Sequence, residues 1–532
     1  MRWLALLATA ASLLLASSAS AAPATIGTGS KPGIAIDAGG TAYIAWYGTE
    51  PSGPTSLHFC RLPRNATGCD VNQTLTPLGQ TLSRPFVRVS GARVDIVNSR
   101  YGFATSSFDQ TLQFTSTDGG ATFGGASPVG TQQFDEAADG PGDAIMTATN
   151  ANTSGGFVQR VPLDATAAAT AADLFPATYL YNGTVGLVNG TTPLALFADA
   201  SSQAAFRIFG GGDYNDQAGW AAPVTIGYAD YPRLAGGPSG LFLLAGTAAG
   251  GLEVRRFNGT TIGTGAQVTA RGDASEAHLY QDAGGRLQAV WPHIESDGWH
   301  LDHAYSDDGV TWQTDPVTVQ RDDEEFSLRV ATAADHAGYA VWTSRANGVS
   351  EVRAGAIDPT PVSHKSVVVK RISGTVRVKR PGSSAYVTLT GAQSVPLGSS
   401  VDVKSGRIAL SSAPRRGVKI ETAQFYSGVF KVSQPGSITE LRLTEALASC
   451  GKGPKAAAKK PKTRKLWGDG SGSFRTRGQY SAATVRGTRW LVQDSCAGTL
   501  TRVKKGAVTV RDFRRRKTVV VRAGKTYLAR PR

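Results

Sequence analysis

The amino-acid sequence predicts an all-β protein, with a six- or seven-bladed β-propeller followed by a C-terminal β-sandwich or β-barrel module. Three observations predict this fold: short apolar runs are separated by Gly- and Asp-containing turns, the unit recurs about every 47 residues, and amphipathic helix patterns are scarce. The 532 residues exceed the size of one compact domain. With 18% charged and 41% hydrophobic residues, the composition excludes wholesale disorder.

The net charge divides the chain into two regions. Residues 361–532 hold 36 Lys and Arg against 7 Asp and Glu, a net charge of +29. Residues 1–360 hold 19 against 33, a net charge of −14. Because one domain rarely carries two such different surfaces, we place a domain boundary near residues 358–366, in the Pro-containing stretch DPTPVSHK.

The first residues have the pattern of a secretory signal peptide. Arg2 precedes an apolar run from Leu4 to Leu15, and Ala19-Ser20-Ala21 has the small residues of a cleavage site. The run is too short for a membrane anchor, and no later stretch has spanning length. We therefore expect a signal peptide over residues 1–21, no transmembrane segment in the mature chain, and an extracellular or cell-surface location.

Export makes the four cysteines candidates for disulfides, and three pairings are possible. The simplest is local pairing, Cys60 with Cys69 and Cys450 with Cys496. No C-x2-C spacing occurs, which disfavours zinc.

The predicted propeller covers residues 31–358. Hairpin patterns at 33–48, 279–293 and 330–344 place Asp or Ala with Gly between two β-rich segments, and weaker copies lie between them. We count seven units, each long enough for a four-stranded blade. Six longer blades, or a pair of antiparallel β-sandwiches, are the alternatives. The second strand of each strong copy ends in a tryptophan: Trp46, Trp291 and Trp342.

Two short motifs predict a particular turn inside this region. The stretch STDGGATF fits the pattern S-x-D-x-G-x-T-(W/F) through Ser116, Asp118, Gly120, Thr122 and Phe123. In such a turn the Asp side chain accepts backbone hydrogen bonds, Gly takes an unusual φ, and the aromatic ring fills the blade. The second copy, YSDDGVTW, has Tyr where Ser is expected and keeps Asp307, Gly309, Thr311 and Trp312.

These motifs resemble the Asp-boxes (BNR repeats) of sialidase-like β-propellers. The resemblance implies a structural role for the boxes, on turns away from the active face. Sialidases also carry an arginine in an R-I-P-like motif before the first blade, whereas this chain reads GSKPGIAID with Lys31. Lysine lacks the two-pronged guanidinium that grips a carboxylate, so we assign no catalytic residue.

A secreted, sialidase-like glycoside hydrolase is the alternative function. Arg84 and Arg233 are then the nearest substitutes for the missing arginine, although an arginine at a strand start is more often a solvated rim residue. The candidate carboxylates and hydroxyl are Glu276, Glu295, Asp230 and Tyr231.

A dense histidine group, WPHIESDGWHLDH, contains His293, His300 and His303. Converging histidines and carboxylates bind metals. A hairpin with these residues on its polar face explains the same pattern. We favour the hairpin and predict no metal and no cofactor.

The basic region predicts a β module in two halves. Residues 366–448 alternate with a period of two and carry Gly and Pro at the turns. A Lys/Pro/Ala segment at 451–465 is expected to be a disordered insert. Strand patterning resumes over 466–532, and a Cys450–Cys496 bridge would join the two halves across the insert.

This region resembles the FecR-like β module. The resemblance rests on I-x-G-x-V-x-V from Ile372 to Val378, ATVRGTRWLV at 483–492 and VVVRAGKTYL at 519–528. In that family the module is the periplasmic part of a membrane-spanning regulator of a sigma factor. This chain has no spanning helix pattern, so the resemblance implies an extracytoplasmic β module, without transmembrane signalling.

The excess positive charge of the module indicates an anionic partner, and we expect an anionic cell-envelope polymer or glycan. Nucleic acid is not expected, because export separates the protein from it and the cations alternate with valine instead of clustering with stacking aromatics. A merely solvated strand face is the alternative. The candidate anion-binding residues form two clusters: Lys459, Lys460, Lys462, Arg464 and Lys465, and Arg514, Arg515, Arg516 and Lys517.

Together these observations predict an exported, non-enzymatic binding or scaffold protein. The propeller face would bind an unknown ligand, and the basic module would hold the protein at the cell envelope. The glycoside hydrolase is the alternative, and a sensor or regulatory partner is a third class.

Overall fold

The computed structural model describes most of the chain. The described ranges are 23–48, 56–75, 84–100, 110–130, 134, 136–149, 155–164, 168–176, 180–282, 285–295, 298–319, 327–333, 337–346, 348–389, 391–415, 420–448 and 463–531. The described residues form β-strands and one short 3-10 helix, η1 (Gln217–Gly219). The predicted all-β class is confirmed.

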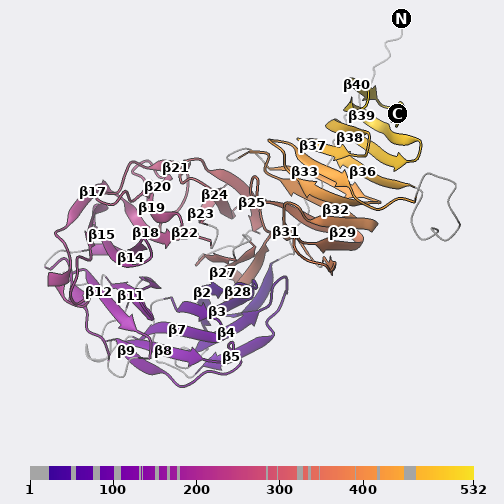
Figure 1. Ribbon diagram of the computed structural model, residues 1–532. Helices are drawn as coiled ribbons and strands as arrows, with labels where there is room; N and C mark the ends of the chain where they lie inside the picture. Colours follow the sequence, from indigo (N-terminus) through magenta and orange to yellow (C-terminus); the bar gives the residue numbers. More distant parts are fainter. Residues whose placement is uncertain are drawn as a thin grey trace, which may run out of the picture.

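Seven four-stranded antiparallel sheets form a ring, the seven-bladed form of the predicted propeller (Figure 1). Blade 1 comprises β2 (Ser30–Ile36), β3 (Ala42–Tyr47), β4 (Leu57–Leu62) and β5 (Val71–Leu75). Blade 2 comprises β6 (Phe86–Ser90), β7 (Arg93–Arg100), β8 (Gln110–Ser116) and β9 (Ser127–Gly130). Blade 3 comprises β10 (Glu136–Asp139), β11 (Ala144–Thr149), β12 (Phe157–Pro162) and β13 (Ala172–Asp173).

The remaining blades follow the same order. Blade 4 comprises β14 (Leu180–Val188), β15 (Thr192–Asp199), β16 (Gln203–Ile208) and β17 (Val224–Tyr228). Blade 5 comprises β18 (Asp230–Gly237), β19 (Gly240–Gly246), β20 (Leu252–Arg256) and β21 (Ala266–Thr269). Blade 6 comprises β22 (His278–Gln281), β23 (Leu287–Glu295), β24 (Gly298–Ser306) and β25 (Gln313–Val319). Blade 7 contains β26 (Arg329–Thr332), β27 (Gly338–Ala346) and β28 (Val349–Ile357).

The first strand among the described residues closes the ring. Strand β1 (Ala24–Thr28) pairs antiparallel with β28 and becomes the fourth strand of blade 7. It precedes residue 31, where the sequence pattern begins the propeller, because a single strand without a hairpin partner has no repeat signal. Closure through strands from both ends of the ring leaves blade 7 without an unpaired edge at β28.

The first strand of each blade lies at the centre of the ring. The inner strands β2, β6, β10, β14, β18, β22 and β26 contact their neighbours around the axis. Because the strands alternate in direction, all inner strands begin on one face of the ring, which we call face A. The connections between the third and fourth strands lie on the opposite face, face B.

Tryptophans fill the spaces between blades. Trp46, Trp291 and Trp342 are each at most 1% exposed. Trp46 packs with Ile26 of β1 and with residues of blade 7, and its indole Nε1 donates to the carbonyl of Thr28 at 3.0 Å. The indole therefore links blade 1 to the closing strand.

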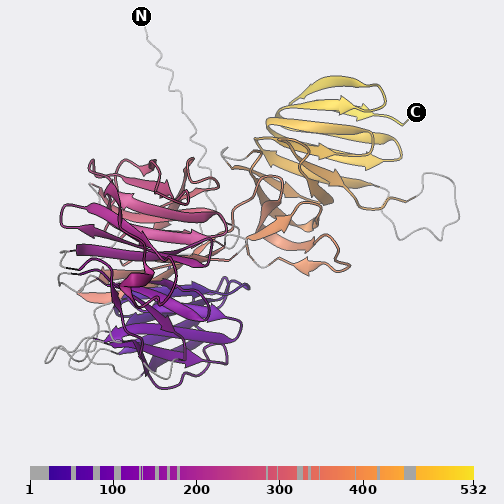
Figure 2. The ribbon, with the colours of Figure 1, turned by 60° about the vertical axis from the view of Figure 1, so that its left-hand side comes forward.

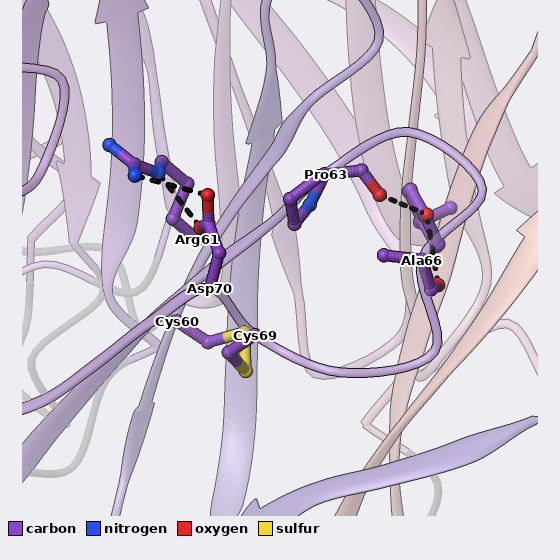
Figure 3. Close-up of a disulfide and its surroundings, with 7 residues drawn as sticks. Cys60, Arg61, Pro63, Ala66, Cys69 and Asp70 are labelled. Carbon is purple, nitrogen blue, oxygen red and sulfur yellow. Dashed lines mark hydrogen bonds and ion pairs between the residues drawn. A yellow bond between two sulfur atoms is a disulfide. The ribbon is translucent and has the colours of Figure 1, made fainter.

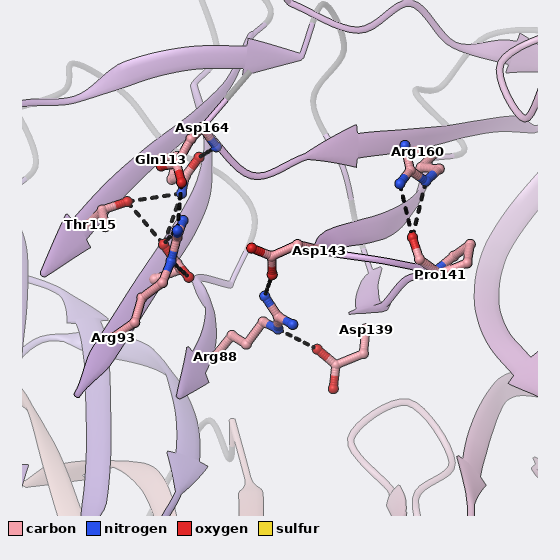
Figure 4. A network of polar contacts seen from close by, with 10 residues as sticks. Arg88, Arg93, Gln113, Thr115, Asp139, Pro141, Asp143, Arg160 and Asp164 are labelled. Carbon is pink, nitrogen blue, oxygen red and sulfur yellow. Dashed lines mark hydrogen bonds and ion pairs between the residues drawn. The ribbon is translucent and has the colours of Figure 1, made fainter. Parts of the chain in front are cut away.

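Polar contacts join blades 2 and 3 (Figure 4). Arg88 of β6 pairs with Asp139 of β10 at 3.2 Å and also with Asp143. Arg93 of β7 pairs with the buried Asp95 at 2.8 Å and with Asp164, which follows β12. These contacts fix one blade against the next.

The remaining strands form one separate sheet of 13 strands (Figure 2). They are β29 (Ser366–Lys379), β30 (Val387–Thr388), β31 (Gln393–Pro396), β32 (Ser400–Ser412), β33 (Glu421–Tyr426), β34 (Val429–Ser433), β35 (Thr439–Leu443), β36 (Arg464–Gly470), β37 (Phe474–Arg477), β38 (Ser481–Ser495), β39 (Gly498–Asp512), β40 (Lys517–Arg522) and β41 (Thr526–Ala529). We call this sheet the β module. Its strands share one apolar core, in which Phe425 contacts Phe430, Phe474 and Trp490.

The two parts of the β module pair directly with each other. Strand β33 is antiparallel to β36, and β35 is parallel to β37. Since β33 and β35 precede the predicted insert and β36 and β37 follow it, main-chain hydrogen bonds join the two parts. No strand of the β module pairs with a strand of the ring among the described residues.

The linker between ring and module runs along face B. Arg286, at the start of β23, donates to the hydroxyl of Thr360 and pairs with Asp307 at 2.8 Å. Lys370 of β29 pairs with Asp358 at 2.7 Å. Together these contacts hold the chain where it leaves the ring.

The structure contains the disulfide Cys60–Cys69, one of the predicted pairs (Figure 3). It closes the loop that follows β4 on face B, and Tyr339 of blade 7 donates its hydroxyl to the carbonyl of Pro63 in that loop at 2.7 Å. Cys496 is also disulfide-bonded. Its predicted partner, Cys450, lies outside the described residues.

Other predicted features also fall outside the description. These are the signal peptide at 1–21 and nearly all of the insert at 451–465. No helix among the described residues is long and apolar enough to span a membrane.

Candidate binding site at the mouth of the propeller

The turn after β8 has the hydrogen-bond pattern proposed for STDGGATF. Asp118 Oδ1 accepts from the Thr122 amide at 2.9 Å, and Ser116 Oγ accepts from the Gly120 amide at 2.8 Å. Hydrogen bonds from the Thr122 hydroxyl, the Thr122 amide and the Ser116 hydroxyl hold the pKa of Asp118 at about 2. Phe123 packs edge-on against Phe59 at 4.8 Å between ring centroids. The turn lies on face B, and its hydrogen bonds and its aromatic contact stabilise the turn itself.

In the turn after β24, the residues that make the characteristic hydrogen bonds lie one position later in the sequence than the motif predicted. Ser306 Oγ accepts from the Gly309 amide at 2.8 Å, and Asp308 Oδ1 accepts from the Thr311 amide at 2.7 Å. Asp307, which the motif assigned to this role, pairs with Arg286 instead. The loop is one residue shorter between Ser and Gly than its counterpart, so Ser306 and Asp308 take the positions expected for Tyr305 and Asp307.

On face A, residues in or just before five inner strands, β2, β6, β10, β22 and β26, line a cavity of about 170 Å³, which we call the axial cavity. Its apolar lining includes Ile34, Phe86 and Val330. Its charged or titratable lining consists of four side chains, each from a different blade: Arg84, Glu136, His278 and Arg329. The site therefore depends on ring closure, because no two of these residues belong to the same blade.

Ion pairs connect these side chains to two further residues. Arg84 Nη2 lies 3.6 Å from Glu276 Oε2. Arg233 Nε and Arg329 Nη2 lie 3.2 and 3.3 Å from the same oxygen, Glu136 Oε1. We call the set Arg84, Glu136, Arg233, Glu276, His278 and Arg329 the mouth cluster. Its three arginines outnumber its two carboxylates.

Burial changes the acid–base properties of the mouth cluster. Loss of solvent raises the pKa of Glu276, although Arg84 and Arg233 act in the opposite direction. Burial and the same two arginines lower the pKa of His278 to about 3, so its imidazole is neutral at physiological pH. Within the mouth cluster, the positive charge comes from the three arginines.

Two nitrogens of residues that line the cavity lack a protein partner among the described residues. Arg84 Nε and His278 Nδ1 are buried and form no hydrogen bond within the described part of the chain. A buried donor without a partner is costly, and a ligand oxygen at this place would satisfy it.

Backbone strain accompanies the site on face A. Lys31 and Tyr231 have φ of 53° and 42°, and each precedes a proline at the start of an inner strand. Strand pairing is irregular at both places, between Ser30 and Gly33 and between Asp230 and Arg233. Such strain is unfavourable for residues with a Cβ, especially before proline. In blade 5 the irregularity precedes Arg233 directly.

The structure brings together some of the residues named for the alternative function and separates others. Arg84, Arg233 and Glu276 lie in the mouth cluster. Asp230 accepts a hydrogen bond from Ser202 at 2.8 Å, Tyr231 is 38% exposed, and the side chain of Glu295 lies outside the description. Sequence reasoning missed Glu136, His278 and Arg329. The only available signal was their position at strand starts.

The histidine group does not converge on one point. His293 stacks on His300 at 5.4 Å between ring centroids and lies 3.2 Å from Asp302. His303 is buried and contacts Gln288 at 2.9 Å. The described residues contain no group of three or more potential metal ligands.

The predicted anion-binding clusters have different environments. Lys459, Lys460 and Lys462 lie outside the description. Arg464 pairs with the buried Asp494 at 2.9 Å and is part of the folded module. Lys465 is exposed, as are Arg514, Arg515 and Arg516 of the turn between β39 and β40 and Lys517, the first residue of β40.

No protein-family model matches the chain, and no curated protein matches its sequence. Solved structures resemble the ring. An α-L-arabinanase of Penicillium chrysogenum in complex with arabinobiose shares 14% identity with a TM-score of 0.38, over 64% of this chain and 98% of that one. A polysaccharide lyase of family PL25, an ulvan lyase, shares 13% identity with a TM-score of 0.40, over 62% and 94%. The lectin BP39L of Burkholderia pseudomallei shares 10% identity with a TM-score of 0.44, over 62% and 96%. These similarities concern the fold.

Proposed function

We propose that the chain is an exported binding protein whose propeller mouth takes a carboxylate-bearing sugar of an acidic glycan. The observation that carries this proposal is the pair of unpartnered nitrogens, Arg84 Nε and His278 Nδ1, in two residues that line the axial cavity. An arginine fork matches the planar geometry of a carboxylate.

The size and lining of the cavity support a single sugar as the bound group. A cavity of about 150 Å³ holds a benzene molecule, so the volume of about 170 Å³ accommodates the carboxylate end of one sugar. Phe86 and Val330 offer apolar contacts, while Glu136 and Arg329 offer polar ones. A sugar presents both C–H surfaces and hydroxyl groups, which fits this mixed wall.

The remaining parts of the proposal concern location and anchoring. Residues 1–21 direct export, the ring is of the Asp-box type, and the β module is FecR-like and holds the protein at an anionic envelope polymer. The hydrogen bonds of the Asp118 turn and the net charge of +29 over residues 361–532 support these assignments.

Calorimetric titration with short galacturonate oligomers, and with neutral galactose oligomers of the same length, tests the mouth site. We expect binding of the charged oligomers only, with affinity reduced at least about tenfold in Arg84→Gln, because a charge-assisted hydrogen bond contributes about 1.5–3 kcal/mol. Arg61→Gln is the matched control, since Arg61 also pairs with a carboxylate, Asp70, but lies in blade 1 beside the face B turn of blade 2. Equal binding of neutral oligomers, or no effect of Arg84→Gln, would contradict the proposal.

A glycoside hydrolase is the second candidate, and one observation favours it. Burial raises the pKa of Glu276, which suits a carboxylic acid that protonates a leaving group. Release of reducing ends from acidic oligosaccharides by the unaltered protein, and its loss in Glu276→Gln, would establish this function. Binding without turnover leaves the binding protein as the assignment.

A further inference from the structure

The β module carries a ladder of aromatic and cationic side chains on the face of the sheet opposite its apolar core. Tyr426 of β33 and Trp467 of β36 are cross-strand partners whose rings lie parallel, at 7° between planes and 6.2 Å between centroids. Strands β32, β33, β36, β38 and β39 lie side by side here (Figure 1). The core residues Phe425, Leu466 and Trp490 alternate with the ladder residues along the same strands.

Cations cover both ends of this aromatic pair. The guanidinium of Arg407 lies 4.8 Å from the Tyr426 ring centroid, and the ammonium of Lys504 lies 5.3 Å from that of Trp467. Arg489 donates to the Tyr426 hydroxyl at 2.9 Å. Contacts between cations and aromatic rings restrict the long side chains, so less entropy is lost when a ligand binds them.

A β-bulge supplies one of these cations. Arg489 pairs with Lys505 and Trp490 pairs with Val503, which leaves Lys504 as an extra residue in β39. A bulge redirects a side chain from its regular alternation. Lys504 and Lys505 are consecutive exposed residues, and Lys504 reaches across β38 to the Trp467 ring.

The ladder also contains one carboxylate. Asp469 lies 3.5 Å from Arg407 and 3.8 Å from Arg489, and its side chain is 38% exposed. Lys465 and Arg502, which are exposed, add positive charge nearby. A polyphosphate has a negative charge on every unit and no hydroxyl group, so Asp469 can only repel it, whereas Asp469 would accept hydrogen bonds from the hydroxyls of a sugar.

We propose that this ladder, formed by Arg407, Tyr426, Trp467, Asp469, Arg489 and Lys504, is the surface through which the β module binds a linear acidic polysaccharide. The proposal deepens the anchoring role proposed above and rests on it. It assigns binding to the sheet face instead of the two basic clusters seen in the sequence. Single-stranded nucleic acid fits less well, because the aromatic faces are occupied by cations and by each other, and bases need free faces.

Retention of the full chain on immobilised polygalacturonate tests the ladder, with Arg84→Gln in every variant to remove the mouth site. We expect at least a tenfold loss of affinity in Arg407→Gln/Arg489→Gln/Lys504→Gln. The matched control, Arg515→Gln/Arg516→Gln/Lys517→Gln, removes the same charge from the β39–β40 turn and should lose less than threefold. Equal losses in the two variants, or a larger loss in the control, would overturn the proposal.

Two further variants keep the test valid if the first one folds poorly. Lys504→Gln/Lys505→Gln changes only exposed bulge residues and should lose at least threefold. Trp467→Leu leaves the charge unchanged and should also lose at least threefold. Unchanged affinity in either variant counts against the ladder.

Competition with polyphosphate and with an oligothymidylate identifies the polymer class. At equal concentrations of negative charge, polygalacturonate should compete best, and stronger competition by either of the others would overturn the polysaccharide assignment. If the chain that carries Arg84→Gln alone is not retained on polygalacturonate, the anchoring role fails together with the ladder. If it binds and the two triple variants behave alike, only the ladder fails.

Discussion

Gly120 shows how a single residue determines a turn of the ring. Its φ is +82°, and a Cβ placed there would lie 2.6 Å from the ring of the buried Phe59. The motif predicted the need for glycine at this place, because the turn chemistry is local. It did not predict the contact with Phe59, which comes from the neighbouring blade.

Gly120→Ala should therefore lower the free energy of unfolding by about 2–4 kcal/mol, since backbone strain and overpacking each cost about 1–3 kcal/mol. Gly125→Ala is the control, because its Cβ would meet no atom within 4 Å and its φ is not positive. Denaturant titration measures both variants. A similar effect of the two substitutions would show that the Phe59 contact is unimportant.

Glu276 gives the mouth a dependence on pH. Burial raises its pKa, so its carboxylate is protonated over a range of pH in which an exposed glutamate is ionised. Ionised Glu276 competes with a ligand carboxylate for Arg84. Affinity for galacturonate oligomers should therefore rise severalfold as pH falls from 7 toward the pKa of Glu276, until the ligand itself is protonated.

Glu276→Gln should bind more tightly at pH 7 and lose this dependence on pH. Calorimetry at several pH values in both proteins measures the effect. A pH profile that is identical in the two proteins would assign the dependence to another group.

At the level of elements, local patterns predicted the hairpins, a propeller of six or seven blades and the Cys60–Cys69 pair, because hairpins and a short loop involve residues close in sequence. The motif predicted the wrong aspartate, Asp307 instead of Asp308, because the second turn is one residue shorter than the first. Sequence analysis also failed for Tyr426 and Trp467, since their strands come from opposite sides of the insert and their register is not readable from periodicity. Sequence analysis named three of the six residues of the mouth cluster: Arg84, Arg233 and Glu276. It could not place them in one site, because they lie near prolines or strand starts and belong to no distinguishing motif.

The loop closed by Cys60 and Cys69 is short, with a sequence separation of 9. Chain entropy assigns such a bridge about 2.5–3 kcal/mol. Cys60→Ala/Cys69→Ala should lower the free energy of unfolding by about this amount or more, since Cys60 is fully buried. Denaturant titration without reductant measures it, and an unchanged midpoint would show that the Tyr339 contacts alone hold the loop.

For the whole molecule, ring closure is the condition for the mouth. Four blades supply the charged and titratable cavity wall, and β1 completes the seventh blade from the opposite end of the ring. The module and linker contacts described here lie on face B, which separates the proposed anchoring surface from the mouth on face A. This arrangement suits a protein whose propeller presents face A to a ligand while the β module binds the anionic envelope polymer.

Ile26→Asp tests closure, because Ile26 is 7% exposed and packs with Trp46. Burying a charge there should cost more than about 3 kcal/mol and weaken oligomer binding at the mouth. Thr28→Asp is the control on the same strand, at an exposed position. Equal stability of the two variants in thermal unfolding would mean that β1 contributes little to closure.

A crystal structure of the full chain with a short galacturonate oligomer tests the proposed binding mode. We expect a sugar carboxylate in the axial cavity on face A, with an oxygen within hydrogen-bond distance of Arg84 Nε and the ring against Phe86. An oligomer bound elsewhere on the ring, with the cavity occupied by water alone, would contradict the proposal.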